Sequence, residues 1–197
     1  MIVRRITPEQ LAERTASAAA ELAVGTFPQS LYPAAATVLV GDVRRQFYTG
    51  QNERGQPWPD LKFPRPQGGN RPLLNTGILA NSYTADPEPN GLIVSSVHAS
   101  ARVHQQGAII RPVRAKALTI PLTKEATRYG PRRFPRQLIC LPGGLYEKKG
   151  QGRRAKLIRH YLFARKVEIP ARPVGFSDDA VEQVGDLLLD YYAGDRT

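Results

Sequence analysis

The chain has 197 residues and a hydrophobic fraction of 41%, values typical of a globular protein with a core of its own. No stretch approaches the roughly 18 consecutive apolar residues of a membrane span, and a single cysteine excludes an internal disulfide. The formal net charge of +11 is uneven, because 16 Lys and Arg lie between Arg111 and Lys166 against two acids, a local charge of +14, whereas the remainder carries −3.

This charge asymmetry favours a polyanion or an acidic protein as partner, although a solvated surface arm explains it equally well. The N-terminus, MIVRRITPEQ, has no apolar signal core, which predicts an intracellular product. Cys140 lies in the apolar run QLICLP, where a buried and inert thiol is expected.

Residues 1–50 predict a helical hairpin. The sequence TPEQ at residues 7–10 offers a capping residue, a proline suited to the first helical position and a capping-box glutamine. This helix is expected to stop near Gly25. A second helix over residues 33–50 presents an apolar face at spacing four, formed by Leu39, Val43 and Phe47. The two apolar stripes can pack against each other.

A loop and a β-hairpin are expected next. Residues 52–72 are rich in Pro and Gly and predict an extended loop, anchored by Trp58 because a lone Trp rarely stays fully exposed. Residues 73–79 predict a short helix or turn. β-rich runs near residues 82–86 and at 92–97, separated by a turn, predict a hairpin.

Residues 108–168 predict a basic β-rich arm inserted into the body. The Arg-rich pieces RYGPRRFPR and EKKGQGRRAK predict mobile turns. Apolar or β-branched runs between the turns predict short strands at residues 117–121, 137–141, 157–158, 161–163 and 167–169.

The last predicted element is a helix over residues 176–193. Ser177 can cap it, and Asp178 and Asp179 suit its first turn. The order of helices, strands, basic insertion and helix predicts an α+β fold, in which the N-terminal helices and the C-terminal helix pack on a small antiparallel β-sheet. We expect a single domain over residues 1–197.

Signals for catalysis and for metal binding are weak. The sequence has no phosphate-binding loop, HExxH motif, CxxC pair or GxSxG elbow. His98 and His104 would share one face of a strand, but no third ligand is near in sequence, so no metal, cofactor or catalytic residue is assigned. A hydrolase with a site around His104, in the stretch HQQG, stays open as an alternative.

Nucleic-acid binding has more support. The basic segment interleaves its cations with aromatic side chains, as a groove for phosphates and stacked bases requires; these are Tyr129, Phe134, Tyr146, Tyr161 and Phe163. No RNP, KH, zinc-finger or helix-turn-helix pattern is present. A DNA-binding accessory protein without sequence specificity is therefore a second functional hypothesis.

Four ordered blocks resemble motifs of the bacteriophage virion morphogenesis family. Phe47 followed by GQPWPDL at residues 55–61 is similar to the family's F…G-x-x-W-x-x-L. LLNTGILANS at residues 73–82 is similar to L-x-x-T-G-x-L-x-x-S. ARVHQQG at residues 101–107 is similar to Y-A-x-x-H-Q-x-G, and IPARP at residues 169–173 is similar to I-P-A-R-P.

Two positions depart from the third motif, since Ser100 replaces its Tyr and Gln106 stands where an aromatic is often found. The long stretch between the third and fourth blocks, with AKALTIP at residues 115–121, resembles the longer, Mu-like branch of the family.

This family includes tail-completion and head–tail joining proteins of Mu-like and P2-like contractile-tailed phages. The resemblance implies a non-enzymatic virion protein, assembled in the bacterial host cytoplasm. It implies a homo-oligomeric ring, expected as a hexamer, at the head-proximal end of the tail or in the neck. The implied partners are neighbouring neck, connector, tail tube or sheath proteins and the genomic DNA in the channel, but no membrane.

Two sets of candidate site residues follow. Motif residues expected to make structural or subunit contacts are Trp58, Thr76, Gly77, His104, Gln105, Gly107 and Arg172. Of these, Thr76 is expected to cap a turn or helix, and Arg172 to contact a carboxylate or a carbonyl. Cations expected to meet DNA or an acidic partner are Arg128, Arg132, Arg133, Arg136, Lys148, Lys149, Arg153 and Arg154.

Overall fold

The computed structural model describes residues 2–6, 27–63, 65–66, 68–88 and 91–194. The predicted first helix, and with it the helical hairpin, lies outside the described residues. The chain divides into two compact units. The first unit comprises residues 1–59, 71–107 and 170–197, and the second comprises residues 60–70 and 108–169. The second unit therefore contains the segment expected as a basic arm, together with part of the preceding loop; the single domain stays a prediction.

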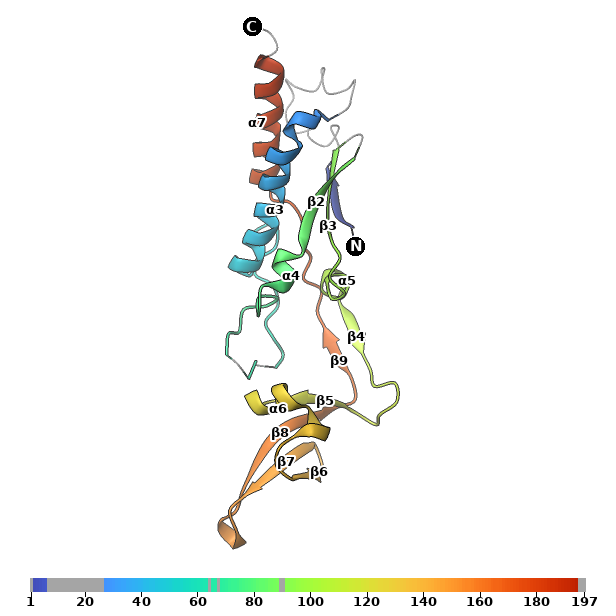
Figure 1. Cartoon of the computed structure of the whole chain (residues 1–197), viewed down its shortest axis with the longest axis vertical. Helices are drawn as coiled ribbons and strands as arrows, with labels where there is room; N and C mark the ends of the chain where they lie inside the picture. The colour runs from blue at the N-terminus through green and yellow to red at the C-terminus, as the bar shows by residue number, and fades with distance from the viewer. Residues whose placement is uncertain (1, 7–26, 64, 67, 89–90, 195–197) are drawn as a thin grey trace. The chain divides into compact units, whose positions relative to one another are not determined.

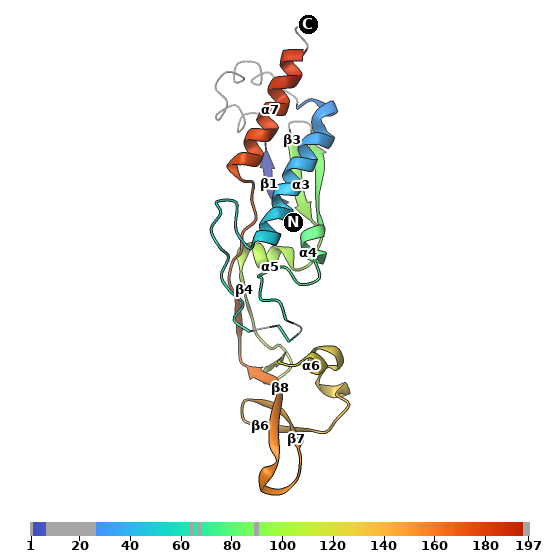
Figure 2. The same ribbon diagram turned by 90° about the vertical axis from the view of Figure 1, so that its left-hand side faces the viewer.

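The first unit has a three-stranded antiparallel sheet with helices packed against it (Figures 1 and 2). The strand order is β1-β3-β2, and β2 and β3 form the predicted hairpin. The bounds are β1 Ile2–Ile6, β2 Tyr83–Glu88, β3 Gly91–Ser96, η1 Gln29–Leu31, α3 Tyr32–Thr49, α4 Ile78–Asn81, α5 Ala101–Gln106 and α7 Asp178–Gly194. Strand β1 was not among the predicted elements, and its pairing with β3 extends the hairpin to a sheet.

The core of the first unit joins α3, α7 and the sheet. Helix α3 packs against β2 and β3 on one side and against α7 on the other, and it buries the predicted face of Leu39, Val43 and Phe47 completely. Helix α7 contributes Val184 and Leu188. At its C-terminal end α3 stops at Gly50, which has a left-handed φ of 75° that glycine adopts without strain. Burial in this core raises the pKa of the Tyr83 hydroxyl to about 12.

The second unit contains a two-stranded ribbon and a four-stranded antiparallel sheet. The ribbon pairs β4 with β9, and the sheet has the order β5-β8-β7-β6. The bounds are β4 Ala108–Ile110, β5 Leu118–Pro121, α6 Lys124–Tyr129, η2 Pro131–Arg133, β6 Leu138–Leu141, β7 Gly144–Lys149, η3 Gly152–Arg154, β8 Lys156–Ala164 and β9 Val167–Ile169. The predicted strands at residues 117–121, 137–141 and 167–169 are confirmed, and those at residues 157–158 and 161–163 form the single strand β8.

In the second unit one helix was not predicted and two expectations were wrong. Helix α6 begins after Thr123, which caps it by accepting a hydrogen bond from the Ala126 amide at 3.2 Å. This cap is a local signal in the sequence that was not used in the prediction. Strand β7 reaches into the predicted turn EKKGQGRRAK because its pairing with β8 continues to Lys149. The Cys140 thiol is exposed rather than buried, because β6 is an edge strand of four residues that pairs with β7 alone.

Both units combine helices with antiparallel strands, which confirms the α+β class. Within the described residues, no helix has the length and apolar character needed to cross a membrane.

Candidate functional site

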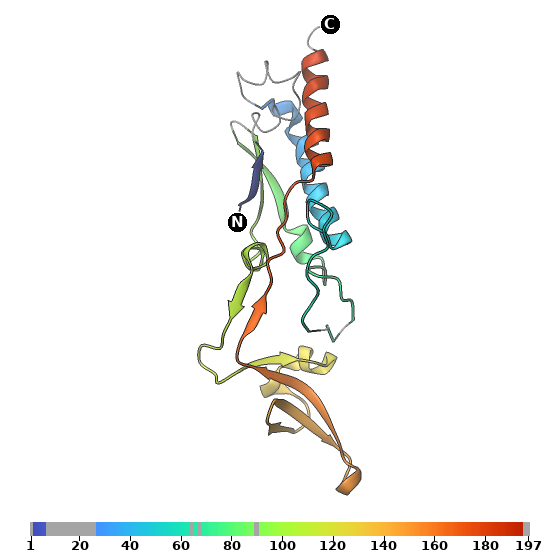
Figure 3. The same ribbon diagram turned by 180° about the vertical axis from the view of Figure 1, so that it is seen from behind.

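The segment between β9 and α7 contains the fourth sequence block and has no regular secondary structure. We call residues 172–177 the strap; it passes α5 before it enters α7 (Figure 3). All of the strap except Pro173 is buried. Buried backbone outside a helix or sheet must find other hydrogen-bond partners, so the side chains that supply them define a site.

Gln105, the glutamine of the HQQG stretch, binds the middle of the strap. Its amide nitrogen donates to the Val174 carbonyl and its amide oxygen accepts from the Val174 amide, each at 3.0 Å. This reciprocal pair replaces the contacts that a neighbouring strand would make. Helix α5 presents Gln105 and ends at Gly107, whose φ of 74° lies in the region that favours glycine.

Arg172 and Trp58 secure the start of the strap. The guanidinium of Arg172 is buried and donates from Nε and Nη2 to the Pro59 carbonyl, at 2.9 and 2.7 Å, so the expected carbonyl contact is confirmed. The Arg172 amide donates to the His104 carbonyl at 2.7 Å. The indole nitrogen of Trp58 donates to the Pro173 carbonyl at 3.1 Å, and its ring meets Phe47 edge-on with centroids 5.5 Å apart.

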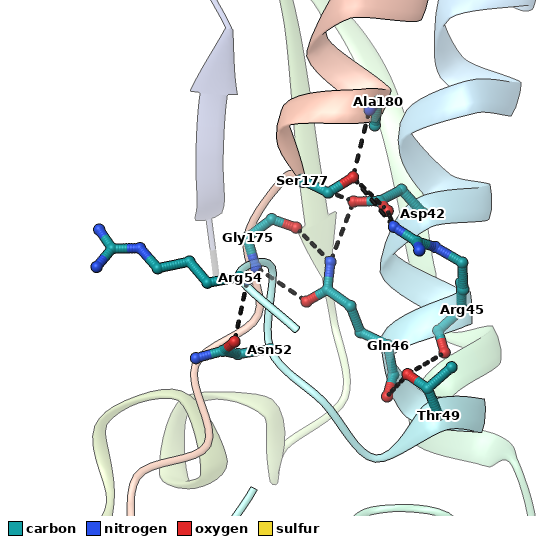
Figure 4. Close-up of polar contacts among 9 residues, drawn as sticks. All are labelled: Asp42, Arg45, Gln46, Thr49, Asn52, Arg54, Gly175, Ser177 and Ala180. Atoms are coloured by element: carbon teal, nitrogen blue, oxygen red, sulfur yellow. Dashed lines mark hydrogen bonds and ion pairs between the residues drawn. The ribbon is translucent and has the colours of Figure 1, made fainter. Parts of the chain in front are cut away.

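Asp42 and Gln46 on α3 hold the end of the strap (Figure 4). Gln46 donates to the Gly175 carbonyl at 2.8 Å and accepts from the Gly175 amide at 3.4 Å. Asp42 accepts from the amide and the hydroxyl of Ser177, at 2.9 and 2.8 Å. The same hydroxyl accepts from the Ala180 amide and caps α7, as predicted.

Asp42 and Gln46 were not predicted as site residues, although the sequence contains a signal for them. Both lie on the helix face that carries Leu39, Val43 and Phe47, at spacings of three and four residues. A polar residue on a face that is otherwise apolar is buried with it and needs a partner. The exposed guanidinium of Arg45 pairs with Asp42 at 2.5 Å, and the hydrogen bond that Arg45 donates to the Asp42 carboxylate raises the pKa of Arg45.

Thr76 and Gly77 lie at a turn before α4. Gly77 precedes the helix with a left-handed φ of 77°, which agrees with the expected turn. The expected Thr76 cap was wrong, because α4 begins after Gly77 with no side-chain cap and Thr76 is exposed. Helix α4 has a single turn, and the burial of Leu79 and Ala80 in the core stabilises it in place of a cap.

His104 lies beside the strap but acts on it through its backbone carbonyl. Among the described residues, its Nδ1 is buried without a hydrogen-bond partner. Burial lowers the pKa of the imidazole, and the charges of Arg172 and His98 lower it further. Burial and two cations are the causes of this shift, with no carboxylate among them, so within the described part of the chain the histidine has the setting of a structural residue.

One cluster of the second unit has the residue types of a metal site. Ligand atoms of Glu125, Glu147 and His160 lie within 4.8 Å of one another. Arg136 already binds both carboxylates, with its Nε 2.9 Å from Glu147. The His160 ring joins Glu147 at 2.9 Å and Thr123 at 2.7 Å.

The hydrogen bond from His160, and then the charge of Arg136, lower the pKa of Glu147. Because a guanidinium already satisfies the two carboxylates, we interpret the cluster as an ion-pair network that joins α6 to β7 and β8.

The predicted cations all lie in the second unit. Arg128 is in α6, Arg132 and Arg133 form part of η2, and Arg136 belongs to the ion-pair network. Lys148 and Lys149 end β7, and Arg154 ends η3; the side chain of Arg153 lies outside the described part. By sequence, the second unit holds 18 Lys and Arg against four Asp and Glu, a formal charge of +14, and the first unit carries −3.

Replacing Gln105 with alanine is expected to lower the free energy of unfolding by about 1–2 kcal/mol, because the amide and carbonyl of buried Val174 lose their partners. Urea unfolding followed by the fluorescence of Trp58, the one tryptophan of the chain, measures the change. The exposed neighbour Gln106 is the control, and its alanine variant should stay within about 0.5 kcal/mol of the wild type. Equal effects of the two variants would contradict the contact with the strap.

His104 is expected to make stability depend on pH. Its pKa is lower in the folded chain than the value of about 6.5 in the unfolded chain. As the pH is lowered below 6.5, the unfolded state therefore binds more protons than the folded state. The free energy of unfolding falls with decreasing pH until the pH is below the pKa of the folded chain.

A His104→Gln variant lacks this contribution, so the stability difference between wild type and variant should shrink from pH 7.5 to pH 5.5. Urea unfolding at both pH values tests it, and a difference that does not change with pH would count against it.

Comparison with known proteins gives one match. The model of the phage virion morphogenesis family matches residues 9–134, which is more than half of the chain. The matched range includes the Trp58 block, the Thr76 block and the HQQG stretch, and it ends before the strap. No curated protein and no solved structure matches the chain.

Proposed function

Since this chain belongs to the phage virion morphogenesis family, we propose that it is a structural, non-enzymatic subunit of a ring at the head-proximal end of the tail or in the neck. There it completes the tail, joins it to the head, or does both around the DNA channel. The family membership is the observation that carries this proposal. Family membership supports a structural role in the virion in general. The location in the tail or neck, the ring and the expected hexamer are our proposal.

Features of both units support ring assembly. In the described part of the chain, β1 and β2 are the edges of the first sheet, and β5 and β6 are the edges of the second. Edge strands present unpaired backbone groups that a second copy can extend. Strand β6 is suited to this contact because its sequence LICL has no charged residue to prevent pairing.

The charge distribution supports a head-to-tail contact. A closed ring needs two different surfaces on each subunit that complement each other. The two units of this chain have formal charges of opposite sign, −3 and +14. Contact between the second unit of one copy and the first unit of the next would bring these charges together.

Measuring the oligomer tests the proposal directly. Mass photometry and negative-stain imaging of the purified full-length chain should show a closed ring, with six-fold symmetry if the hexamer is correct. In the phage, deletion of the protein should leave heads and tails that do not join, and imaging of virions should place the protein at the head-proximal end of the tail. A chain that stays monomeric at all concentrations, together with normal joining in the deletion phage, would overturn the proposal.

A DNA-binding accessory role is the second candidate, favoured by the +14 charge of the second unit. It predicts DNA binding without ring formation. A hydrolase with a site at His104 receives no support from the surroundings of that histidine, and the structural proposal expects a His104→Ala phage to retain head–tail joining wherever the variant folds.

A further inference from the structure

We propose that the turn between β7 and β8 binds the phosphate backbone of DNA without reading its sequence. The turn together with the strand ends beside it, residues 148–156 with the sequence KKGQGRRAK, is called the basic tip. It lies at the end of the β7–β8 hairpin, away from α6 within the second unit (Figure 1). The inference rests on the proposed function for the source of the DNA, whereas the binding itself is tested separately.

Three of the four acids of the second unit bind partners outside the tip. Glu125 and Glu147 bind Arg136, and Glu147 also binds His160. Glu168 pairs with Lys166. In the described part of the chain the exposed side chains of the tip have no ion pair, and these are Lys148, Lys149, Arg154 and Lys156.

The strand register places two of these cations directly opposite each other. Lys149 pairs with Lys156 across the β7–β8 hairpin. Like charges at directly opposed positions destabilise a hairpin, so the pairing is unfavourable in the chain by itself. An anion between the two ammonium groups removes the repulsion, and a phosphate with several oxygens can accept hydrogen bonds from both.

The composition of the tip favours nucleic acid over an acidic protein. Protein interfaces have a centre of aromatic or other large side chains that are buried on binding. Residues 148–156 contain no apolar side chain larger than that of Ala155. Phosphate contacts need only accessible cations. Gly150 and Gly152, with φ of 93° and 65°, let the turn form without backbone strain.

The strands next to the tip carry a further cation, which lies over an aromatic ring. Arg159 on β8 lies over the ring of Tyr146 on β7, with 5.4 Å between the guanidinium carbon and the ring centre. Both belong to one cross-strand pair of the hairpin. The tip itself contains only the three-residue η3, too short to enter a major groove as a recognition helix, so the contact is to the backbone rather than to bases.

The test measures the salt dependence of DNA binding by the full-length chain. Fluorescence anisotropy with a labelled duplex of random sequence, at several NaCl concentrations, gives the slope of log K against log salt. A variant with Lys148, Lys149, Arg154 and Lys156 changed to Gln should lower the magnitude of this slope by up to about 3.6, at about 0.9 per phosphate contact. Circular dichroism checks that the variant keeps its fold.

A matched control removes the same charge elsewhere in the second unit. Changing Lys124, Arg128, Arg132 and Arg133 to Gln leaves the same net charge and should retain most of the slope. An equal loss in both variants would overturn the assignment to the tip. Poly-L-glutamate is the second probe, and tip-dependent binding to it without binding to DNA would overturn the choice of nucleic acid.

The oligomeric state of the same proteins separates this inference from the proposed function. If the tip variant forms rings but loses DNA binding, both proposals stand. If the wild-type chain forms rings and binds no DNA at low salt, the inference fails and the ring proposal survives. If it binds DNA through the tip but stays monomeric at all concentrations, and the deletion phage joins heads to tails normally, the ring proposal fails and the inference stands.

Discussion

Replacing Trp58 with alanine is expected to lower the free energy of unfolding of the first unit by about 3–5 kcal/mol, the usual cost of truncating a buried Trp. The side chain is 5% exposed and belongs to the core cluster of α3, the sheet and α7. It touches Phe47 edge-on, and its indole nitrogen holds the Pro173 carbonyl. Truncation therefore leaves a cavity and releases one end of the strap.

A Trp58→Phe variant separates these two effects. Phenylalanine retains most of the buried ring but cannot donate to Pro173, so a loss of about 1 kcal/mol from the hydrogen bond is expected in addition to a smaller packing loss. Because both variants lack the one tryptophan, urea unfolding is followed by circular dichroism at 222 nm. If the alanine variant were as stable as the phenylalanine variant, Trp58 could not be a core residue in solution.

Replacing Asp42 with alanine is expected to cost about 2–4 kcal/mol, because the change leaves several buried donors without an acceptor. The amide and hydroxyl of Ser177 both donate to Asp42, and so does the side chain of Gln46. Asp42 itself is buried. Loss of this contact, which Figure 4 shows, also weakens the position of Ser177, the cap of α7. The helix and the strap are therefore expected to loosen together.

Arg45→Ala is the matched control for Asp42→Ala. It removes the ion pair with Asp42 and a 3.1 Å hydrogen bond from Arg45 to the Ser177 hydroxyl, while leaving the bonds between Asp42 and the strap. Because the Arg45 side chain is exposed, these contacts together are expected to contribute less than about 1 kcal/mol. Trp58 fluorescence during urea unfolding reports on both variants. Similar losses of stability in the two variants would contradict a main contribution from the hydrogen bonds between Asp42 and the strap.

The elements that were predicted correctly are those whose signals are local. The second helix has an apolar face at the helical period and a glycine at its end, and it was found at residues 32–49. The last helix has its cap and acidic first turn in consecutive residues. The family resemblance, carried by short ordered blocks, is confirmed over residues 9–134.

The candidate site was only partly predictable. The sequence blocks identified Trp58, Gln105 and Arg172, and all three contact the strap or belong to it. The blocks could not identify their partners, because Gln105 meets Val174 across 69 residues and Arg172 meets Pro59 across 113. Asp42 and Gln46 were overlooked because a helical pattern reports which residues share a face, not which backbone groups that face will meet.

Four features were predictable from the amino-acid sequence, namely the α+β class, the helices with strong local signals, the uneven charge and the family. Periodicity, capping and composition each act within a few residues, so they can be read from the order of amino acids alone. The contacts of the HQQG stretch, in contrast, depend on the folded chain. Folding brings the buried strap beside α5, where an unpaired amide and carbonyl require partners, and Gln105 supplies them. His104, beside it, contributes its carbonyl to the Arg172 amide.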